Sequence, residues 1–420
     1  MITRIQALHY SCLRYVDQEV GPFQLLVGAN ATGKTTFLDV VSFFGELVTQ
    51  GVESAVRERS SNPQDLMWKQ QTGTFELAIE VAIPDALRFR ISQPGFSHVR
   101  YEVAVGTEVA GEGVGLSAEK VWLTLADDGR ERQPGEFPEL RAEPKTILLP
   151  KHKSKAQQRL VISKVEGGND NYTTETEKGY SPSFKQSPKK SALANLPADE
   201  ASFPVSTWLK AFLTEGIQPF VLNSQLIRKA SPPKQGRGFR TDGSNLPWII
   251  EELKQNHRDR FDDWVRHLGT ALADLRDIRT VEREDDRHRY LMLRYANGLE
   301  IPSWMASDGT LRLLALTLPA YLPGFQGLYL IEEPENGVHP RAAETVFQSL
   351  SSVYEAQVLL ATHSPVLLSL IKPRDAGKVL CFAKAKDGST DIISGDRHPG
   401  LRKWQGDPNL SVLFAGGVLG

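Results

Sequence analysis

The chain has 420 residues, of which 40% are hydrophobic and 24% charged, and its formal net charge is −2. This composition is typical of a soluble globular protein with a substantial core, built as one large domain or two to three ordinary ones. Only two cysteines are present, which excludes a disulfide framework and a cysteine-based zinc site. No apolar run is long enough to span a membrane and the chain does not begin with a signal peptide, so we expect a cytoplasmic protein.

The first 50 residues predict strands followed by a helix. Residues 1–27 read as strands around a turn at Gly21-Pro22, and the apolar run Phe23–Val27 predicts a buried strand. Residues Thr36–Phe44 have the pattern of an amphipathic helix, which we expect to continue to about Gln50.

The segment between this strand and helix has the sequence GANATGKTT and fits the phosphate-binding pattern G-x-x-x-x-G-K-[ST]. Backbone N–H groups of such a loop, together with the start of the helix, bind phosphates. Lys34 would contact the β- and γ-phosphates and Thr35 would bind Mg²⁺, so the predicted cofactors are ATP and Mg²⁺. The predicted ATP-binding residues of the loop are Gly28, Gly33, Lys34, Thr35 and Thr36.

Period-2 patterns predict an antiparallel sheet with one solvent-exposed face after the first helix. The patterns lie at 74–83, 99–105 and 121–125. We therefore assign residues 1–126 to an N-terminal ATPase lobe with a β subdomain.

Residues 127–242 are interpreted as a basic, loop-rich insertion and lobe connection, with short strand candidates at 146–149 and 160–162. Lys151–Lys190 contains nine basic and four acidic residues, and Arg228–Arg240 contains five basic residues and no acid. These segments form either a patch that faces nucleic acid or a solvated, flexible insertion.

Residues 243–420 are predicted to form a C-terminal ATPase lobe. This lobe begins with two helices and a hairpin: helices at 246–253 and 260–275, and strands at 278–281 and 290–295 joined by a solvated loop at 284–288. Helices and strands then alternate to the end, which is the pattern of a parallel sheet with helical crossovers. The predicted fold class is therefore α/β.

Two acidic residues, Glu332 and Glu333, end the apolar strand candidate that begins at Gly327. One carboxylate at such a strand end can hold the Mg²⁺ shell, and the next can polarise an attacking water. The alternative is a pair of solvated acids at a strand terminus.

Two further motifs lie in this lobe. Ser307 and Gly309 open an apolar helix, where they form a second anion-binding helix start or an ordinary N-cap. His363 follows the apolar strand candidate Val358–Thr362, where an imidazole either contacts a γ-phosphate or is a loop residue without a role.

The order of these motifs resembles that of an ABC-type ATPase. The resemblance implies Walker B acids, with Glu332 supporting Mg²⁺ and Glu333 catalytic, and a switch histidine. It also implies a signature motif that binds the nucleotide of the opposite subunit, and a D-loop. The matching residues are Asn30 in the phosphate loop, Ser307 and Gly309 in the signature, Glu332 and Glu333 in Walker B, Glu335-Asn336-Gly337 in the D-loop and His363 as the switch. The Q-loop glutamine is either Gln218 or Gln225.

The branch of the family follows from the spacing. Lys34 and Ser307 are 273 residues apart, a split that resembles SMC, RecF and overcoming-lysogenisation-defect ATPases rather than transporter ATPases. SMC proteins place long coiled coils in this split, and no heptad pattern is visible here. The segments at 21–36, 307–316, 330–340 and 359–365 closely resemble those of stand-alone ATPase subunits of bacterial antiviral defence systems, such as the Septu ATPase.

This resemblance implies a homodimer with composite ATP sites that regulates a separate effector, a nuclease or toxin. No acid cluster of the nuclease type follows His363, so we do not expect the chain to cut nucleic acid itself. The alternatives are a RecF-like DNA-repair ATPase and an ATP-bound scaffold without hydrolysis. The apolar tail Leu410–Leu419 is expected to pack on a partner or on the core of the protein itself.

Overall fold

A computed structural model of the protein describes residues 1–419 except 112, 127–134, 151–156, 177–180 and 236–237. The chain divides into two compact units. Unit 1 comprises Met1–Ile217, Arg374–Trp404 and Gly417–Gly420, and unit 2 comprises Gln218–Pro373 and Gln405–Gly416. Both units combine helices with sheets, as predicted for an α/β protein.

An eight-stranded antiparallel sheet forms most of unit 1, in the order β2-β1-β4-β5-β6-β7-β8-β9. The strands are β1 (Ile2–Tyr10), β2 (Leu13–Glu19), β4 (Thr74–Ala82), β5 (His98–Gly106), β6 (Gly115–Thr124), β7 (Gln158–Val165), β8 (Asp170–Tyr172) and β9 (Ser183–Phe184). The strands predicted from period-2 patterns are present. The expected solvent-exposed face is wrong for β5, because every residue from Val99 to Gly106 is buried.

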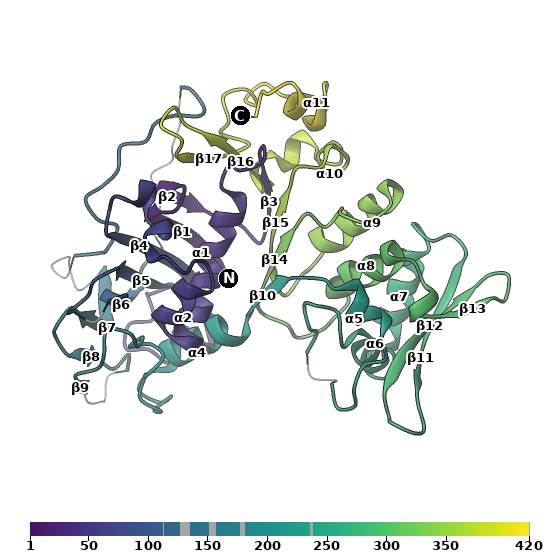
Figure 1. Ribbon diagram of the computed structural model, residues 1–420, viewed down its shortest axis with the longest axis horizontal. Coiled ribbons are helices and arrows are strands. Elements are labelled where there is room, and N and C mark those ends of the chain that lie inside the picture. Colours follow the sequence, from purple (N-terminus) through teal and green to yellow (C-terminus); the bar gives the residue numbers. More distant parts are fainter. Residues whose placement is uncertain (112, 127–134, 151–156, 177–180, 236–237, 420) are drawn as a thin grey trace. The chain divides into compact units, whose positions relative to one another are not determined.

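Helices α1 (Lys34–Gln50), α2 (Val52–Arg57) and α4 (Pro204–Glu215) lie beside this sheet, and α3 (Asp85–Arg88) is a single turn (Figure 1). Helix α1 turns its apolar side toward the strands. The Phe44 ring lies 5.0 Å from that of Tyr101 on β5, and the Phe43 ring lies 5.6 Å from that of Phe75 on β4. These aromatic contacts hold α1, and therefore the loop that precedes it, against the sheet.

Three further strands of unit 1 are β3 (Phe23–Val27), β16 (Val379–Lys384) and β17 (Thr390–Ser394). Strand β16 pairs with β3 in parallel and with β17 in antiparallel orientation. All five residues of β3 are buried, as its apolar sequence predicts.

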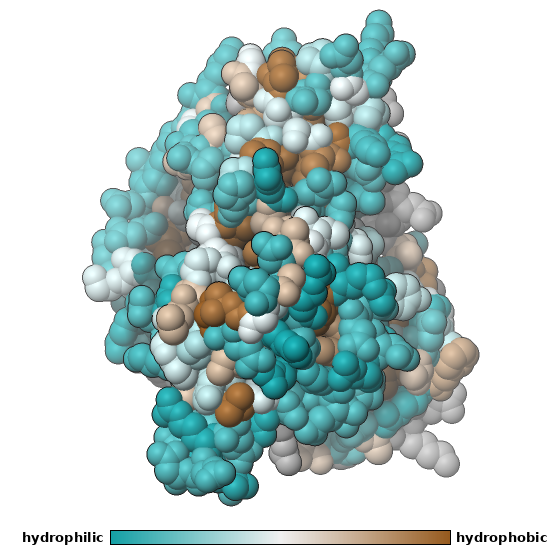
Figure 2. Space-filling model, turned by 90° about the vertical axis from the view of Figure 1, so that its right-hand side faces the viewer, coloured by the Kyte–Doolittle hydropathy of each residue, from teal (hydrophilic) through white to brown (hydrophobic). Residues whose placement is uncertain are grey.

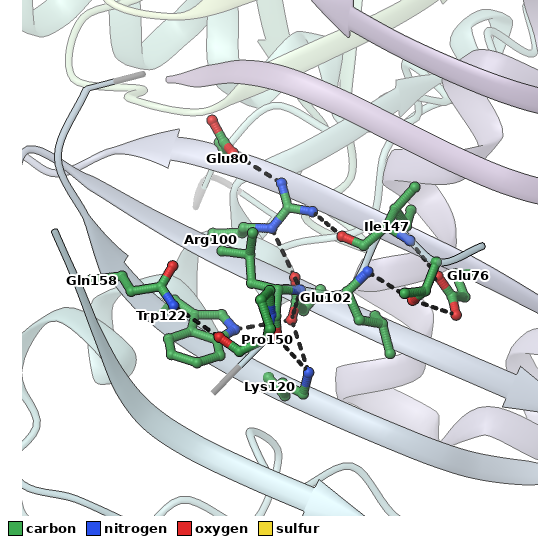
Figure 3. Close-up of polar contacts among 12 residues, drawn as sticks. Glu76, Glu80, Arg100, Glu102, Lys120, Trp122, Ile147, Pro150 and Gln158 are labelled. Atoms are coloured by element: carbon green, nitrogen blue, oxygen red, sulfur yellow. Dashed lines mark hydrogen bonds and ion pairs between the residues drawn. The ribbon is translucent and has the colours of Figure 1, made fainter. Parts of the chain in front are cut away.

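The predicted strand at 146–149 is wrong, because side chains satisfy the backbone of this segment (Figure 3). Segment Thr146–Pro150 lies against β4, β5 and β6 and is held by charged residues of these strands. Its contacts are Ile147 N to Glu76 Oε2 (2.7 Å), Leu149 N to Glu102 Oε1 (2.9 Å), Arg100 Nη2 to Ile147 O (2.9 Å) and Lys120 Nζ to Leu149 O (2.7 Å).

Unit 2 contains β10 (Ile217–Phe220), β14 (Leu328–Glu332) and β15 (Gln357–Thr362), with β10 beside β14 and β14 parallel to β15. A separate antiparallel sheet consists of β11 (Leu275–Glu282), β12 (Arg289–Tyr295) and β13 (Glu300–Pro302). The helices of the unit are α5 (Ser224–Arg228), α6 (Leu246–Asn256), α7 (Arg258–Leu268), α8 (Asp308–Thr317), α9 (Pro340–Ser351), α10 (Pro365–Ser369) and α11 (Leu410–Ala415).

Most of the predicted elements of this part are present, with one boundary error. The helix expected at 260–275 ends at Leu268, where Gly269 follows, and the chain enters β11 at Leu275. The predicted hairpin is confirmed, since β11 and β12 pair in antiparallel orientation around the acidic loop at 284–288.

The C-terminal tail packs on the protein itself. Helix α11 contacts α10, and Leu410 and Leu419 are fully buried, whereas Leu413 and Phe414 are half-buried. This agrees with the expected packing on the core of the protein. No helix within the described ranges is both long and apolar enough to cross a membrane.

Candidate functional site

The phosphate-loop pattern lies between β3 and α1 in unit 1, as predicted. Packing explains why the two fixed positions Gly28 and Gly33 are occupied by glycine. A Cβ atom on Gly28 would collide with the Phe382 carbonyl oxygen, and a Cβ atom on Gly33 would collide with the Thr390 hydroxyl. Gly33 also has φ +99°, which disfavours other residues. The loop is therefore a tightly packed concave turn in which only glycine fits at these two positions.

The Lys34 ammonium lies inside the curve of this loop. Lys34 is buried, and its Nζ donates hydrogen bonds to the carbonyl oxygens of Gly28 (2.7 Å) and Ala29 (2.9 Å). Thr32 Oγ1 donates a third hydrogen bond to Ala29 O at 2.8 Å. The lysine thus provides a buried cation at the position that the phosphate-loop pattern requires.

The start of α1 adds to this anion-binding chemistry. The helix begins at Lys34 without a side-chain cap from Gly33 and without an acidic residue in its first turn. The first N–H groups of a helix lack intrahelical acceptors and carry partial positive charge, so they favour an anionic ligand. Thr35 and Asn30 are exposed beside this helix start, and Thr36 is half-buried with its Oγ1 3.4 Å from Cys12 Sγ.

A residue that the sequence did not indicate supports the loop. Thr390 on β17 donates from Oγ1 to Thr32 O (2.9 Å), and its N–H donates to Cys12 O (3.0 Å). Thr390 lies 358 residues beyond Thr32 in sequence, and no local pattern marks it. Long-range contacts of this kind fix the loop but leave no signal in a single sequence.

The two predicted Walker acids lie at the end of β14 in unit 2. Residues Leu328–Ile331 are buried and Glu332 is exposed. Glu333 has φ +46°, and its N–H donates to Ala361 O of β15 at 2.8 Å. A residue other than glycine in the left-handed region is strained, and such strain is concentrated at functional sites.

The structure brings Glu333 and His363 together, as expected if both act on one ligand. Glu333 Oε1 lies 2.9 Å from His363 Nδ1, and Glu333 Oε2 accepts a hydrogen bond of 2.5 Å from Asn336 Nδ2. His363 directly follows β15, and Glu333 directly follows β14. The two residues lie close together because β14 and β15 are parallel neighbours that end at the same edge of the sheet. Asn336 therefore holds one oxygen of the Glu333 carboxylate, while the other lies close to His363 Nδ1, which is buried and makes no hydrogen bond among the described residues.

Glu335 is a further carboxylate at this corner. Its Oε1 accepts a hydrogen bond of 2.5 Å from Thr362 Oγ1, and its Oε2 is buried without a partner in the described part of the chain. Burial raises the pKa of the Glu335 carboxyl above its ordinary value. The motif resemblance places this residue in the D-loop, and its half-buried position next to Thr362 was not evident from the sequence.

The predicted signature residues lie at the start of α8. Ser307 is the N-cap: its Oγ accepts a hydrogen bond from Thr310 N at 3.1 Å. A Cβ atom on Gly309 would lie 2.9 Å from Gly337 O, so glycine permits close packing of α8 on the turn after β14. The capping alternative is thus observed, and it leaves Ser307 exposed at the helix start.

Arg228 does not belong to a free basic patch. Its Nε donates to Asp308 Oδ1 (3.0 Å) and its Nη1 donates to Trp304 O (3.1 Å), so it supports the start of α8. Several other cations of the predicted basic segments are also engaged, among them Lys164, which pairs with the buried Asp170. The predicted cations Lys151, Lys153, Lys155, Lys178 and Arg237 lie outside the described residues.

Each unit offers one predicted Mg²⁺ ligand, Thr35 in unit 1 and Glu332 in unit 2. No group of three or more His, Cys, Asp or Glu side chains among the described residues could hold a metal alone. Mg²⁺ commonly takes one or two protein oxygens and completes its shell with phosphates and water. Thr35 and Glu332 offer such oxygens, and they remain the predicted ligands. Gln218 lies in β10 and Gln225 is exposed on α5, and both remain candidates for the Q-loop.

One protein-family model, described as "AAA domain, putative AbiEii toxin, Type IV TA system", matches residues 23–369. The chain belongs to this family. The match includes the phosphate loop, helix α8 and both strand ends that carry Glu333 and His363. Membership in this AAA family therefore supports the interpretation of the protein as a nucleotide-binding ATPase.

Two solved structures show the fold of this AAA protein. An SMC head bound to the C-winged helix domain of ScpA is 14% identical, with a TM-score of 0.53, over 94% of this chain and 97% of that one. An SMC head domain with an extended coiled coil, bound to the C-terminal domain of ScpA from Pyrococcus furiosus, is 13% identical, with a TM-score of 0.50, over 94% and 96%. No curated protein matches the chain. The predicted SMC-like ATPase head fold is thus confirmed, and the narrower likeness to Septu ATPases remains a prediction.

Proposed function

We propose that this AAA protein binds ATP with Mg²⁺ and hydrolyses the γ-phosphate bond. The observation that carries this proposal is the phosphate loop of unit 1. Its glycines are required by packing, its lysine is buried inside the curve, and α1 begins without a side-chain cap. Each of these features favours polyphosphate binding.

The roles of the individual residues follow from this assignment. Lys34 binds the β- and γ-phosphates, together with the backbone of Gly28, Asn30, Gly33 and Thr36. Thr35 and Glu332 hold Mg²⁺, whose charge stabilises the phosphates when it is bound. Glu333 orients the attacking water and accepts its proton, and His363, which lies 2.9 Å from Glu333, contacts the γ-phosphate.

We further propose that two copies of the chain close around two ATP molecules, with Ser307 and Gly309 reaching the nucleotide of the opposite copy. Ser307 is exposed at the start of α8, and the neighbouring side chains Trp304 and Met305 are 46% and 67% exposed. The face in Figure 2 is mainly hydrophilic with separate hydrophobic areas. The exposed apolar pair beside the predicted signature supports the proposed interface.

The cellular role we propose is regulation of a separate effector, a nuclease or toxin, in cytoplasmic antiviral defence. The family description names a toxin of a type IV system, and the similar SMC heads are each bound to a separate protein, ScpA. Among the described residues, candidates for nucleic-acid contact are the exposed cations Lys185, Lys190, Lys229, Lys234 and Arg240. A RecF-like repair ATPase and a non-hydrolysing scaffold are the alternatives.

Titration calorimetry with ATP and Mg²⁺ tests the central proposal. Lys34→Ala removes a charge-assisted contact of about 1.5–3 kcal/mol, so ATP affinity should fall about ten- to a hundredfold. Lys378→Ala removes an exposed lysine of the same unit that pairs with Asp375, and it should leave affinity unchanged. Equal ATP affinity of wild type and a folded Lys34→Ala protein would reject the phosphate-loop assignment.

A further inference from the structure

A chain of two hydrogen bonds connects Glu335 to the backbone on both sides of His363. Glu335 Oε1 accepts a hydrogen bond of 2.5 Å from Thr362 Oγ1, and the same hydroxyl oxygen accepts a hydrogen bond of 2.9 Å from Ser364 N. Thr362 is the last residue of β15, and Ser364 immediately precedes α10. The Thr362 hydroxyl therefore closes a turn around the single residue between them, His363.

The Thr362 hydroxyl can serve both neighbours in only one orientation. A hydroxyl has one hydrogen to donate and accepts through its lone pairs. Because the hydrogen points to Glu335, the lone pairs are left for the N–H of Ser364. Thr362 and Ser364 are both buried, so water does not readily replace a lost partner. The Glu335 carboxylate thus fixes the hydroxyl, and the hydroxyl fixes the turn.

The imidazole of His363 depends on this turn for its orientation. Its Nδ1 lies 2.9 Å from Glu333 Oε1 but makes no hydrogen bond within the described part of the chain. The side chain of His363 is 41% exposed, so packing covers the ring only in part. The backbone at 362–364 is therefore the main support that presents the ring to Glu333.

We propose that Glu335 is a positioning residue for ATP hydrolysis, which acts through the Thr362 hydroxyl to hold His363 toward Glu333. This role rests on the proposed ATPase function and adds to it a residue that was assigned neither to Mg²⁺, nor to the attacking water, nor to phosphate.

Only one oxygen of Glu335 is needed for the proposed role. Its Oε1 accepts from Thr362, whereas its Oε2 is buried and has no hydrogen-bond partner among the residues that the structure describes. An uncharged acceptor at the position of Oε1 should therefore serve as well as the carboxylate. This distinguishes a positioning residue from an acid that acts through its charge.

Phosphate release with ATP and Mg²⁺ gives the first test. Glu335→Ala removes the acceptor of the Thr362 hydroxyl, so kcat should fall about tenfold, the effect of roughly one hydrogen bond, while KM stays within about twofold. Glu335→Gln keeps an oxygen acceptor and should restore kcat to within about threefold of wild type. Glu344→Ala is the matched control, because this exposed glutamate of α9 bonds only Gln348 among the described residues, and it should change neither constant.

A double-mutant cycle with His363→Ala shows whether Glu335 acts through the imidazole. In a His363→Ala background, Glu335→Ala should cost less than about twofold, because no ring is left to position. Thr362→Val should match Glu335→Ala, and the two together should be no slower than either alone. Melting temperatures show whether each variant folds, and Glu335→Met and Thr362→Ala replace variants that do not.

The surroundings of the ring can also be measured without turnover. The protein has nine histidines, and with selective ¹³C labelling of their rings the signal that is lost in His363→Ala identifies His363. In the absence of ATP, Glu335→Ala and Thr362→Val should shift this signal, whereas Glu335→Gln and Glu344→Ala should leave it in place.

These outcomes separate the role of Glu335 from the ATPase function itself. If the wild-type protein releases no phosphate, the ATPase proposal fails, and the NMR comparison still decides whether Glu335 positions His363. If the wild-type protein is active, the positioning role alone is overturned by any of three results. These are a Glu335→Gln protein as slow as Glu335→Ala, a full tenfold cost of Glu335→Ala without His363, or a His363 signal that Glu335→Ala does not move.

Discussion

Replacing Glu333 by glutamine separates ATP binding from ATP hydrolysis. The amide keeps the size of the side chain, and its oxygen can still accept from Asn336, which donates to the carboxylate at 2.5 Å. A neutral amide cannot accept the proton of the attacking water. General-base catalysis contributes about 10²- to 10⁴-fold, so phosphate release at saturating ATP should fall by that factor, or about 3–5 kcal/mol in the barrier.

ATP affinity should remain within about twofold, because Glu333 is not assigned to phosphate binding. Phosphate release is measured with a coupled assay, and calorimetry gives ATP affinity of the same preparation. Glu344→Gln is the matched control, since Glu344 is an exposed glutamate on α9 that bonds only Gln348 among the described residues. Unchanged phosphate release by a folded Glu333→Gln protein would refute the role of Glu333. A loss of ATP binding instead would mean that Glu333 supports the nucleotide and not the water.

Three further predictions concern stability, assembly and pH. Glu102→Ala removes the carboxylate that the buried cations Arg100 and Lys120 share. The free energy of unfolding should therefore fall by about 3–5 kcal/mol in urea titrations. Protease should also cut segment Thr146–Pro150 faster. Glu215→Ala, at an exposed helix end, should change neither. Arg228→Ala releases Asp308 and should reduce ATP-driven dimerisation about tenfold in light-scattering titrations without changing ATP affinity, a split that an overall folding defect would not produce. Burial lowers the pKa of His398 from 6.5 to about 4. Between these two pH values the unfolded chain therefore binds more protons than the folded protein. The free energy of unfolding should fall by at most about 3 kcal/mol as the pH drops from 6.5 to 4. His398→Phe should flatten the melting temperature across that window, and an unchanged pH profile would contradict this assignment.

The parts of the site that the sequence predicts are those in which the relevant residues are neighbours in the chain. The phosphate loop is one such part, because β3, the glycines and α1 follow each other within Phe23–Gln50. The acidic end of β14 and the histidine after β15 are others, since each is an apolar run that ends in a polar residue. Local patterns of this kind survive in a single sequence because burial and hydrogen bonding within one element determine them.

The features that sequence reasoning missed depend on distant partners. Segment Thr146–Pro150 has a strand-like composition, but residues from 76 to 120 supply its hydrogen-bonding partners as side chains. Arg228 lies in a basic run, yet its partner Asp308 is 80 residues away and converts an apparent patch residue into a support for α8. Neither pairing could be read from composition, because tertiary contacts decide whether a charge is solvated or paired.

Lys34 and Glu333 have one property in common: each already makes hydrogen bonds within the protein. Lys34 bonds carbonyl oxygens of its own loop, and the Glu333 carboxylate accepts a hydrogen bond from Asn336. Binding and hydrolysis of ATP must therefore exchange these contacts for phosphate and water, and each exchange contributes only the difference between two hydrogen bonds. The affinity of such a site depends less on the number of contacts than on the charge that phosphate adds. Asn336→Ala frees one oxygen of Glu333 from its internal partner, so it should raise phosphate release if opening that contact limits the rate. A turnover that falls to the level of Glu333→Gln would show instead that Asn336 holds the carboxylate in its working position.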